Sequence, residues 1–177
     1  MRTTQVQIVM PRHANGVQRL FGGQLMDWID IVAAVEARRH AGSDVTLAAV
    51  DPLEFLAPVH VNDTVVIQAQ VTWTGRTSLE VSVETFVERL DGVRDLVNRA
   101  YLVFVAVDEQ GNPVPVQPYE PEEGEPDERQ AAAHRHQLRM ALREAAKQNI
   151  PRTEKQSHIL SEHAAFCTPL GDRQDGN

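Results

Sequence analysis

The pattern of hydrophobic and polar positions singles out one stretch near the start of the chain. Nearly every position in residues 25–37 is apolar, and Asp27, Asp30 and Glu36 are the exceptions. A helix that is apolar on almost all sides is normally buried in a protein core. We therefore expect a buried helix over residues 23–40, which is too short and too charged to cross a membrane.

Alternating polar and apolar residues predict β-strands on either side of this helix. The stretches that show this alternation are residues 4–10, 45–59, 64–75, 77–90 and 94–108. Pro52 interrupts the second of them, which predicts a bulge or an edge position there. Gly75-Arg76 and Asp91-Gly92 separate the later strands, and both pairs indicate hairpin turns.

Short hairpin connections cannot join parallel strands, so the predicted strands must pair in an antiparallel sheet. The simplest packing for one such sheet and one buried helix is a sheet wrapped around the helix. The fold class is therefore α+β, with one antiparallel sheet around one long central helix and a C-terminal helical and disordered tail. Open edges of the sheet would favour self-association.

The C-terminal third of the chain has a different composition. Residues 112–130 are rich in Pro and Glu and predict an extended linker. Residues 131–149 contain good helix formers, and a modest apolar face is formed by Leu138, Met140, Leu142 and Ala145. We therefore expect a domain over residues 1–116, then a linker, a short helix and a tail predicted to be disordered over residues 117–177.

Composition and charge narrow the range of functions. The 177 residues include 25 acidic and 17 basic side chains, a net charge of −8, which argues against a nucleic-acid or membrane partner. A local basic site for a phosphorylated ligand stays compatible with this charge. The single cysteine, Cys167, excludes a disulfide within one chain, and no metal-ligand spacing is present. Residues 1–10 lack the layout of a signal peptide, so we expect a cytoplasmic protein.

The chemistry-bearing residues gather at the start of the predicted buried helix. Gly22 and Gly23 open it, and backbone N–H groups at a helix N-terminus can bind an anion or an oxyanion. Asp30 lies on a polar stripe along the same helix, and Asn15 lies on the loop just before it. An oxyanion site, a carboxylate base or nucleophile and an orienting amide together suit hydrolysis of an activated acyl group.

Each of these residues also has a purely structural interpretation. A glycine pair before a helix is often a turn device, and Asn15-Gly16 alone predicts only a turn. Asp30 could be a structural carboxylate bonded to backbone groups or to an arginine across an interface. Asp27 is best explained as an exposed carboxylate near the helix start.

Three further residues each have both a functional and a structural interpretation. His13 is either a base or an ordinary loop histidine. Asp51, between an apolar run and Pro52, caps the bulge or belongs to a site. Arg76, at a hairpin tip, either binds a phosphate or is a solvated turn residue, and the second interpretation is slightly favoured.

Four blocks of the sequence together resemble a known family. They are HANGVQRLFGGQLMDWID, VTLAAVDPLEFLAPV, VTWTGRTSLEV and FVAVDEQGNPVPV, in this order. They closely resemble the hotdog-fold acyl-CoA thioesterases of the cytosolic acyl-CoA hydrolase type, over about residues 5–116. The resemblance implies a "sausage" helix inside an antiparallel sheet and hydrolysis of acyl-CoA to a free acid and CoA, with no cofactor besides the coenzyme A of the substrate.

The resemblance also implies roles for individual residues. Asp30 would act as general base or nucleophile, Asn15 would orient the water or the carbonyl, and the Gly23 N–H, beside that of Gly22, would stabilise the oxyanion. Residues 75–78 match the block that holds the CoA phosphates. That block contains Arg76, Thr77 and Ser78, and Arg38 or Arg39 of a neighbouring subunit would assist it.

The resemblance further implies a homo-oligomer. Two subunits would pair their sheets edge to edge, Asn15 and Asp30 would meet from different subunits, and three dimers would form a homohexamer. The sequence departs from the family at Gln18, where a glycine is usual. Two alternative functions remain open: a non-catalytic acyl-CoA-binding regulator, and an enoyl-thioester hydratase or dehydratase, which would need an Asp/His pair such as Asp30 with His13.

Overall fold

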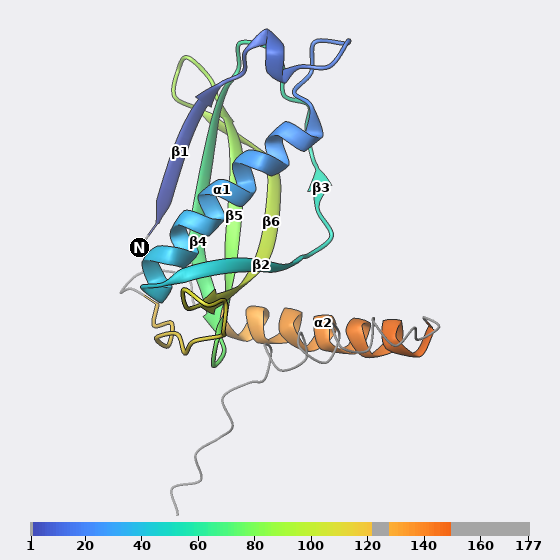
Figure 1. The fold of residues 1–177 in the computed structure, drawn as a ribbon. Helices are drawn as coiled ribbons and strands as arrows, with labels where there is room; N and C mark the ends of the chain where they lie inside the picture. Colours follow the sequence, from blue (N-terminus) through green and yellow to red (C-terminus); the bar gives the residue numbers. More distant parts are fainter. Residues whose placement is uncertain (1, 122–127, 150–177) are drawn as a thin grey trace, which may run out of the picture.

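A six-stranded antiparallel sheet curls around one long helix (Figure 1). The computed structural model describes residues 2–121 and 128–149. The central helix is α1 (Gly22–Ala41), and the strands are β1 (Thr3–Ile8), β2 (Asp44–Val50), β3 (Glu54–Phe55), β4 (Thr64–Thr74), β5 (Ser78–Glu88) and β6 (Arg94–Val107). Every pairing is antiparallel, in the order β1-β4-β5-β6-β2, and β3 also pairs with β6. The predicted α+β architecture is confirmed.

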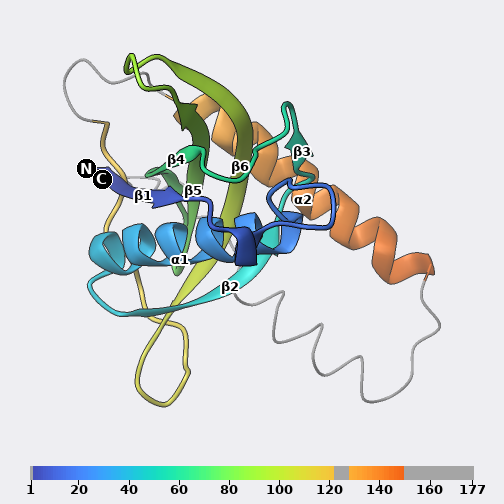
Figure 2. The same cartoon turned by 90° about the horizontal axis from the view of Figure 1, so that it is seen from above.

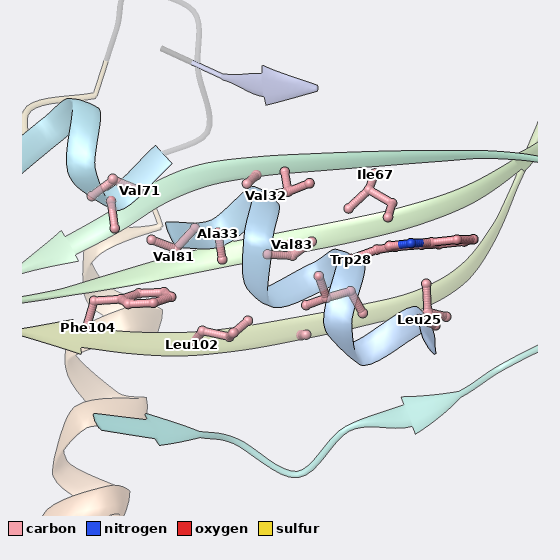
Figure 3. Packing of buried hydrophobic residues seen from close by; sticks show 14 of the residues in the cluster. Leu25, Trp28, Val32, Ala33, Ile67, Val71, Val81, Val83, Leu102 and Phe104 are labelled. Carbon is pink, nitrogen blue, oxygen red and sulfur yellow. The ribbon is translucent and has the colours of Figure 1, made fainter. Parts of the chain in front are cut away.

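The core lies between α1 and the concave face of the sheet (Figure 3). Leu25, Trp28 and Val32 of α1 are buried against inward-facing side chains of β4, β5 and β6. These sheet residues alternate along their strands, and they include Ile67, Val71, Val81, Val83, Leu102 and Phe104. The apolar run of the sequence is therefore buried because a sheet covers it, as its composition predicted.

The C-terminal end of α1 follows from the local sequence, whereas Phe21 at its N-terminal end forms no side-chain capping bond. Gly42 follows the last turn with a φ of 66°, a left-handed conformation that glycine adopts without steric cost, and its N–H donates to the Arg38 carbonyl at 2.9 Å. The helix is one residue longer at each end than the sequence predicted. Pro52 ends the extended run as expected, since β2 stops at Val50 and only the two residues of β3 resume the sheet.

A second helix, α2 (Arg129–Asn149), crosses the opposite face of the sheet (Figure 2). It starts two residues earlier than predicted, and it contacts the sheet differently from what its apolar residues suggested. Ala132 and Arg139 are buried against the sheet, whereas Leu138, Met140 and Leu142 are exposed. The predicted tail and residues 122–127 of the linker lie outside the described residues. Neither described helix is long and apolar enough to cross a membrane.

Candidate active site

The N-terminus of α1 offers unused backbone donors. The helix begins at Gly22, and its first recorded backbone bonds run from the Gln24 and Leu25 N–H groups to the Phe21 carbonyl, at 2.9 and 3.2 Å. Among the described residues, no hydrogen bond uses the N–H of Gly22 or Gly23. A Cβ atom at Gly23 would lie 3.0 Å from Cε1 of Phe21, so glycine keeps this helix end uncrowded. The helix dipole makes the same end favourable for negative charge.

The loop before α1 holds Asn15 in one orientation. Its side-chain Oδ1 accepts hydrogen bonds from the N–H groups of Val17 and Arg19, at 3.1 and 3.2 Å. The predicted turn is therefore present, and the amide oxygen stabilises it. No bond to the Asn15 Nδ2 group occurs in the described part of the chain. The side chain is exposed and is left with a donor for a ligand.

Gln18, the residue that departs from the family pattern, has an unusual backbone. Its φ is +59°, in the left-handed region that favours glycine. Its N–H donates to the Asn15 carbonyl at 3.0 Å, and its carbonyl accepts from the Val61 N–H at 3.2 Å. The loop therefore requires the conformation that a glycine would adopt most easily, and here glutamine adopts it.

A pocket of about 360 Å³ opens between this loop, the start of α1 and the segment after β3. Asn15 and Gly22 both line it, so the structure brings these two predicted site residues together. The remaining lining is mostly apolar, and it consists of Arg19, Leu20, Leu25, Phe55, Leu56, Ala57, Pro58 and Val59. A mostly apolar cavity beside backbone donors suits an acyl chain with a polar carbonyl end.

Asp30 lies further along α1 and is half-buried. Its Oδ1 atom is buried and has no hydrogen-bond partner in the described part of the chain. Burial raises the pKa of the Asp30 carboxyl, and the nearby negative charge of Asp27 raises it further. The structural interpretation of Asp30 through a partner in its own chain finds no backbone group or arginine at Oδ1 among the described residues. Within one chain, Asn15 and Asp30 form no contact recorded among the described residues.

The neighbours of Asp30 have simpler roles. Asp27 is exposed, as predicted, and its Oδ2 accepts a hydrogen bond from Gln24 Nε2 at 3.1 Å. The His13 ring packs edge-on against Trp28, with centroids 5.1 Å apart, and its Nδ1 lies 3.1 Å from the Met10 N–H. No ion pair joins His13 to Asp30 in the described residues. This arrangement does not form the Asp/His pair that a hydratase would need.

The predicted phosphate-binding turn lies away from the pocket within a single chain. Residues 75–78 connect β4 to β5 near the C-terminal end of α1, whereas the pocket lies at its N-terminal end (Figure 1). Arg76 is exposed, but the side chains of Thr77 and Ser78 are buried. A Cβ atom at Gly75 would lie 2.9 Å from Cη2 of Trp73, which explains the glycine in this turn.

The two arginines proposed to assist this turn are engaged within the chain. Arg38 forms an exposed ion pair with Asp44, with 2.8 Å between Nη2 and Oδ1. Arg39 Nη1 donates to the Thr3 hydroxyl at 2.8 Å. Thr3 in turn donates to the buried Glu36 carboxylate at 2.6 Å. Arg39 and Glu36 therefore help to attach β1 to α1.

The sequence analysis missed a buried charged cluster on the outer face of the sheet. Glu80 of β5 has 0% exposure and accepts hydrogen bonds from Thr72 Oγ1 and from Arg135 Nη2, each at 2.7 Å. Arg139 bridges Glu80 and Asp51, with 2.7 Å from its Nε to Asp51 Oδ1. The i, i+4 spacing of the two arginines in the sequence was the available signal. Among the described residues, no group of three or more His, Cys, Asp or Glu could hold a metal ion.

Comparisons with known proteins agree with this geometry. The model of the thioesterase superfamily matches residues 18–92. An uncharacterised acyl-CoA thioester hydrolase of Bacillus subtilis is 41% identical over 115 residues, which are 64% of this chain and 67% of that protein. An acyl-CoA hydrolase of Staphylococcus aureus, solved with butyryl coenzyme A and coenzyme A, superposes with a TM-score of 0.79 at 33% identity, over 83% of this chain and 91% of that chain.

A third similar protein has been solved as an oligomer. An acyl-CoA thioesterase solved as an apo hexamer superposes with a TM-score of 0.75 at 37% identity, covering 79% of this chain and 91% of the other. The resemblance seen in the four sequence blocks is confirmed over most of the described residues. The chain therefore belongs to the thioesterase superfamily, with the hotdog fold of the acyl-CoA thioester hydrolases.

Proposed function

We propose that this protein hydrolyses acyl-CoA thioesters to a free carboxylic acid and coenzyme A. The observation that carries the proposal is the half-buried Asp30 carboxyl, whose Oδ1 is buried and unpartnered among the described residues, on the helix whose N-terminal donors open onto an apolar pocket. An unpartnered carboxylate is costly in a core unless it has chemical work to do. The named activity of the relatives supports the same reaction.

The spacing of the site residues supports the assignment of Asn15 and Asp30. In the Staphylococcus aureus hydrolase, an asparagine and an aspartate have each been replaced by alanine, and these positions lie 15 residues apart in its chain. Asn15 and Asp30 are separated by the same interval here. We therefore assign these two residues as the catalytic pair.

A third position studied in that relative points to Thr46. A threonine 17 residues beyond its aspartate was also replaced by alanine. Thr46 lies 16 residues beyond Asp30, on the exposed edge strand β2. The two intervals differ by one residue, so Thr46 matches that position only with a one-residue gap between α1 and β2, and we include its exposed hydroxyl in the proposed site on that basis. Nothing in its sequence surroundings had suggested it.

The proposed reaction uses water and the residues of this chain. Asp30, as general base, removes a proton from a water molecule that attacks the thioester carbonyl carbon. The carbonyl oxygen becomes an oxyanion, which the Gly23 N–H and the dipole of α1 stabilise. The C–S bond then breaks, and the proton held by Asp30 passes to the departing thiolate. Alternatively, Asp30 attacks the carbonyl carbon directly, the C–S bond breaks and the CoA thiolate leaves. Water then hydrolyses the resulting anhydride, which regenerates the Asp30 carboxylate and releases the acid, and the proton set free passes to the thiolate.

The proposed site needs a second copy of the chain. Within one chain Asn15 does not reach Asp30, and β2 leaves a free sheet edge with Leu47 and Val50 exposed. Pairing of two β2 edges would bring the Asn15 loop of one subunit to the Asp30 of the other. The hexameric relative supports a homohexamer built from three such dimers. In this assembly Arg76, on the turn with Thr77 and Ser78, would contact the CoA phosphates from a neighbouring subunit.

Thiol release from a panel of acyl-CoAs tests the proposed function. Asp30→Asn should lower kcat by about 10²–10⁴-fold, because the amide cannot accept the proton of water. Asp27→Asn is the matched control, since this exposed carboxylate lies one turn away, and it should retain the neutral-pH rate. A folded Asp30→Asn protein with the full rate would contradict the mechanism. Tight acyl-CoA binding by a wild-type protein that releases no thiol would instead indicate the binding regulator.

A further inference from the structure

The pocket wall formed by residues 51–59 has little packing of its own. It contains the two-residue strand β3, and Glu54, Phe55 and Leu56 are all exposed. Few side chains of this segment are buried, so its position depends on the individual contacts that fasten it to the rest of the molecule. Phe55, Leu56 and Ala57 line the pocket, and any movement of the wall therefore changes the space for an acyl chain.

Three of these fastening contacts join the wall to neighbouring backbone. The side chain of Asn98, which is fully buried in β6, donates to the Glu54 carbonyl at 2.8 Å. The Leu56 N–H donates to the Val97 carbonyl at 2.9 Å. At the far end, the Val59 carbonyl accepts from the Leu20 N–H at 2.8 Å. The wall is thus tied to β6 in its middle and to the catalytic loop at its end.

A further contact, at the start of the wall, comes from α2. Asp51 begins the wall, and its own N–H donates to the Tyr101 carbonyl at 3.0 Å. Its carboxylate receives the Arg139 guanidinium in a two-point contact, with Nε to Oδ1 at 2.7 Å and Nη2 to Oδ2 at 3.3 Å. No other residue of segment 51–59 forms an ion pair in the described part of the chain.

Arg139 is itself held rigidly. The residue is 9% exposed, and its Nη2 also contacts Glu80, which is fully buried in the middle of the sheet. Arg135 makes a second ion pair with Glu80 and lies 3.8 Å above the Tyr101 ring centroid. Arg135 Nη2 also lies 3.6 Å from the Glu128 carboxylate, so three carboxylates surround the two guanidinium groups of this cluster. Such a cluster is rigid while complete, because loss of one member leaves a buried charge unpaired.

We propose that the Arg139–Asp51 ion pair positions the wall of the acyl pocket and thereby determines which acyl chains the enzyme accepts. The inference rests on the proposed acyl-CoA hydrolase function. Arg139 and Asp51 are positioning residues, since neither lines the pocket. The C-terminal helix, which lies on the opposite face of the sheet from α1, thus contributes to substrate selection.

Steady-state kinetics of the full-length protein test this role. Arg139→Gln and Asp51→Asn should each raise KM for a long-chain acyl-CoA by about tenfold, and they should change KM and kcat for acetyl-CoA by less than about twofold. The double variant also lacks the ion pair, so it should show the same raised KM for the long-chain substrate, and full recovery would mean that the single variants act only through an unpaired charge. Arg89→Gln breaks an exposed Arg–Asp pair of the β5–β6 hairpin, Arg89–Asp95, and should change neither substrate's kinetics.

Equal effects on both substrates, or none, in variants with wild-type circular dichroism and assembly mass would overturn the proposal. If Arg139→Gln fails to fold, Arg139→Lys keeps the charge but loses the two-point contact, and it should show the same selectivity change at smaller size. A wild-type protein without thiol release would refute the proposed function instead. In that case, amide hydrogen exchange at Leu56 tests the positioning role of Arg139 without any need for activity. It should be faster in the Arg139 variant than in the Arg89→Gln control, and equal rates would overturn the positioning role.

Discussion

At the scale of single residues, the surroundings of Asp30 destabilise its ionised carboxylate and at the same time make that carboxylate a stronger base. Its carboxylate is partly desolvated, lacks a partner on Oδ1 and lies near the negative charge of Asp27. All three conditions disfavour the ionised form, so the native state holds the proton more tightly than the unfolded chain does. Stability must therefore fall as pH rises from the ordinary aspartate range through the raised pKa of Asp30. The same raised pKa makes the carboxylate a stronger base.

The first residue-scale prediction concerns pH. Hydrolysis requires ionised Asp30, so the rate should fall as pH drops through the raised pKa of this carboxyl. Asp27→Asn removes the charge that contributes to the shift, and the acid limb of the kcat/KM profile should move to lower pH. The measurement is the pH–rate profile of both proteins. An acid limb at the same pH in both would contradict the assignment of Asp30 as the titrating base.

The second residue-scale prediction concerns Gln18. A left-handed conformation costs a non-glycine residue about 1–2 kcal/mol, and glycine loses about half to one kcal/mol more backbone entropy. Gln18→Gly should therefore raise the free energy of unfolding by about 0.5–1 kcal/mol in urea denaturation, since φ is +59° at this position. Val17→Gly, in the same exposed loop, is the control and should lower it. Destabilisation by Gln18→Gly would show that the loop adopts another path.

At the scale of elements, α2 is attached to the sheet chiefly through charge. Its inward side presents Arg135 and Arg139 to the buried Glu80, and His136 stacks on Trp73 with ring centroids 4.6 Å apart. Desolvation lowers the pKa of His136, and the positive charge of Arg143 lowers it further. The neutral ring therefore persists at physiological pH and stacks without adding a third positive charge to the cluster.

Removal of the Glu80 carboxylate should show how much the buried charged cluster contributes to the free energy of unfolding. Glu80→Gln leaves Arg135 and Arg139 without full compensation, so the free energy of unfolding should fall by about 3–5 kcal/mol. Glu84→Gln is the matched control, because Glu84 lies four residues along the same strand and pairs with Arg99 at the surface. An exposed pair contributes only about 0–1 kcal/mol. Similar losses in both variants would refute a special role for the buried cluster.

The elements with a strong hydrophobic period could be predicted from the sequence, and those that depend on distant partners could not. The continuous apolar run of α1 and the alternation in β4 and β5 are local signals. The inward side of α2 was not predictable from its own residues. Its arginines are buried only because Asp51 and Glu80, 88 and 59 residues earlier in the chain, meet Arg139 there. The left-handed Gln18 and the engaged Asn15 oxygen likewise depend on the closed loop.

At the scale of the whole molecule, the proposed site is divided between two chains. Asn15 and Gly22 share a pocket, whereas Asp30 lies further along α1 and Arg76 lies at the opposite end of the helix. This arrangement supports the proposal that one chain supplies complementary halves of a site that two copies complete. The family resemblance implied that Asn15 and Asp30 meet from different subunits, whereas the local sequence pattern alone placed both residues near one helix start without separating them.

Subunit mixing tests this division. Asn15→Ala and Asp30→Ala proteins should each be nearly inactive alone. After dissociation and reassembly in equal amounts, half of the dimers carry both variants, and each mixed dimer has one intact site, so about one quarter of the wild-type rate should return. Thiol release before and after mixing is the measurement, with each variant carried through the same treatment alone. No recovery despite mixed assemblies in native mass spectrometry would place both residues in one subunit's site.

The free β2 edge has a thermodynamic consequence for any preparation of this protein. If folded copies are completed by pairing along β2, where Leu47 and Val50 are exposed, then folding and association share one equilibrium. The midpoint of thermal unfolding then depends on protein concentration, and specific activity declines on dilution as mass action separates the subunits. The catalytic rate per chain therefore depends on the protein concentration as well as on the sequence.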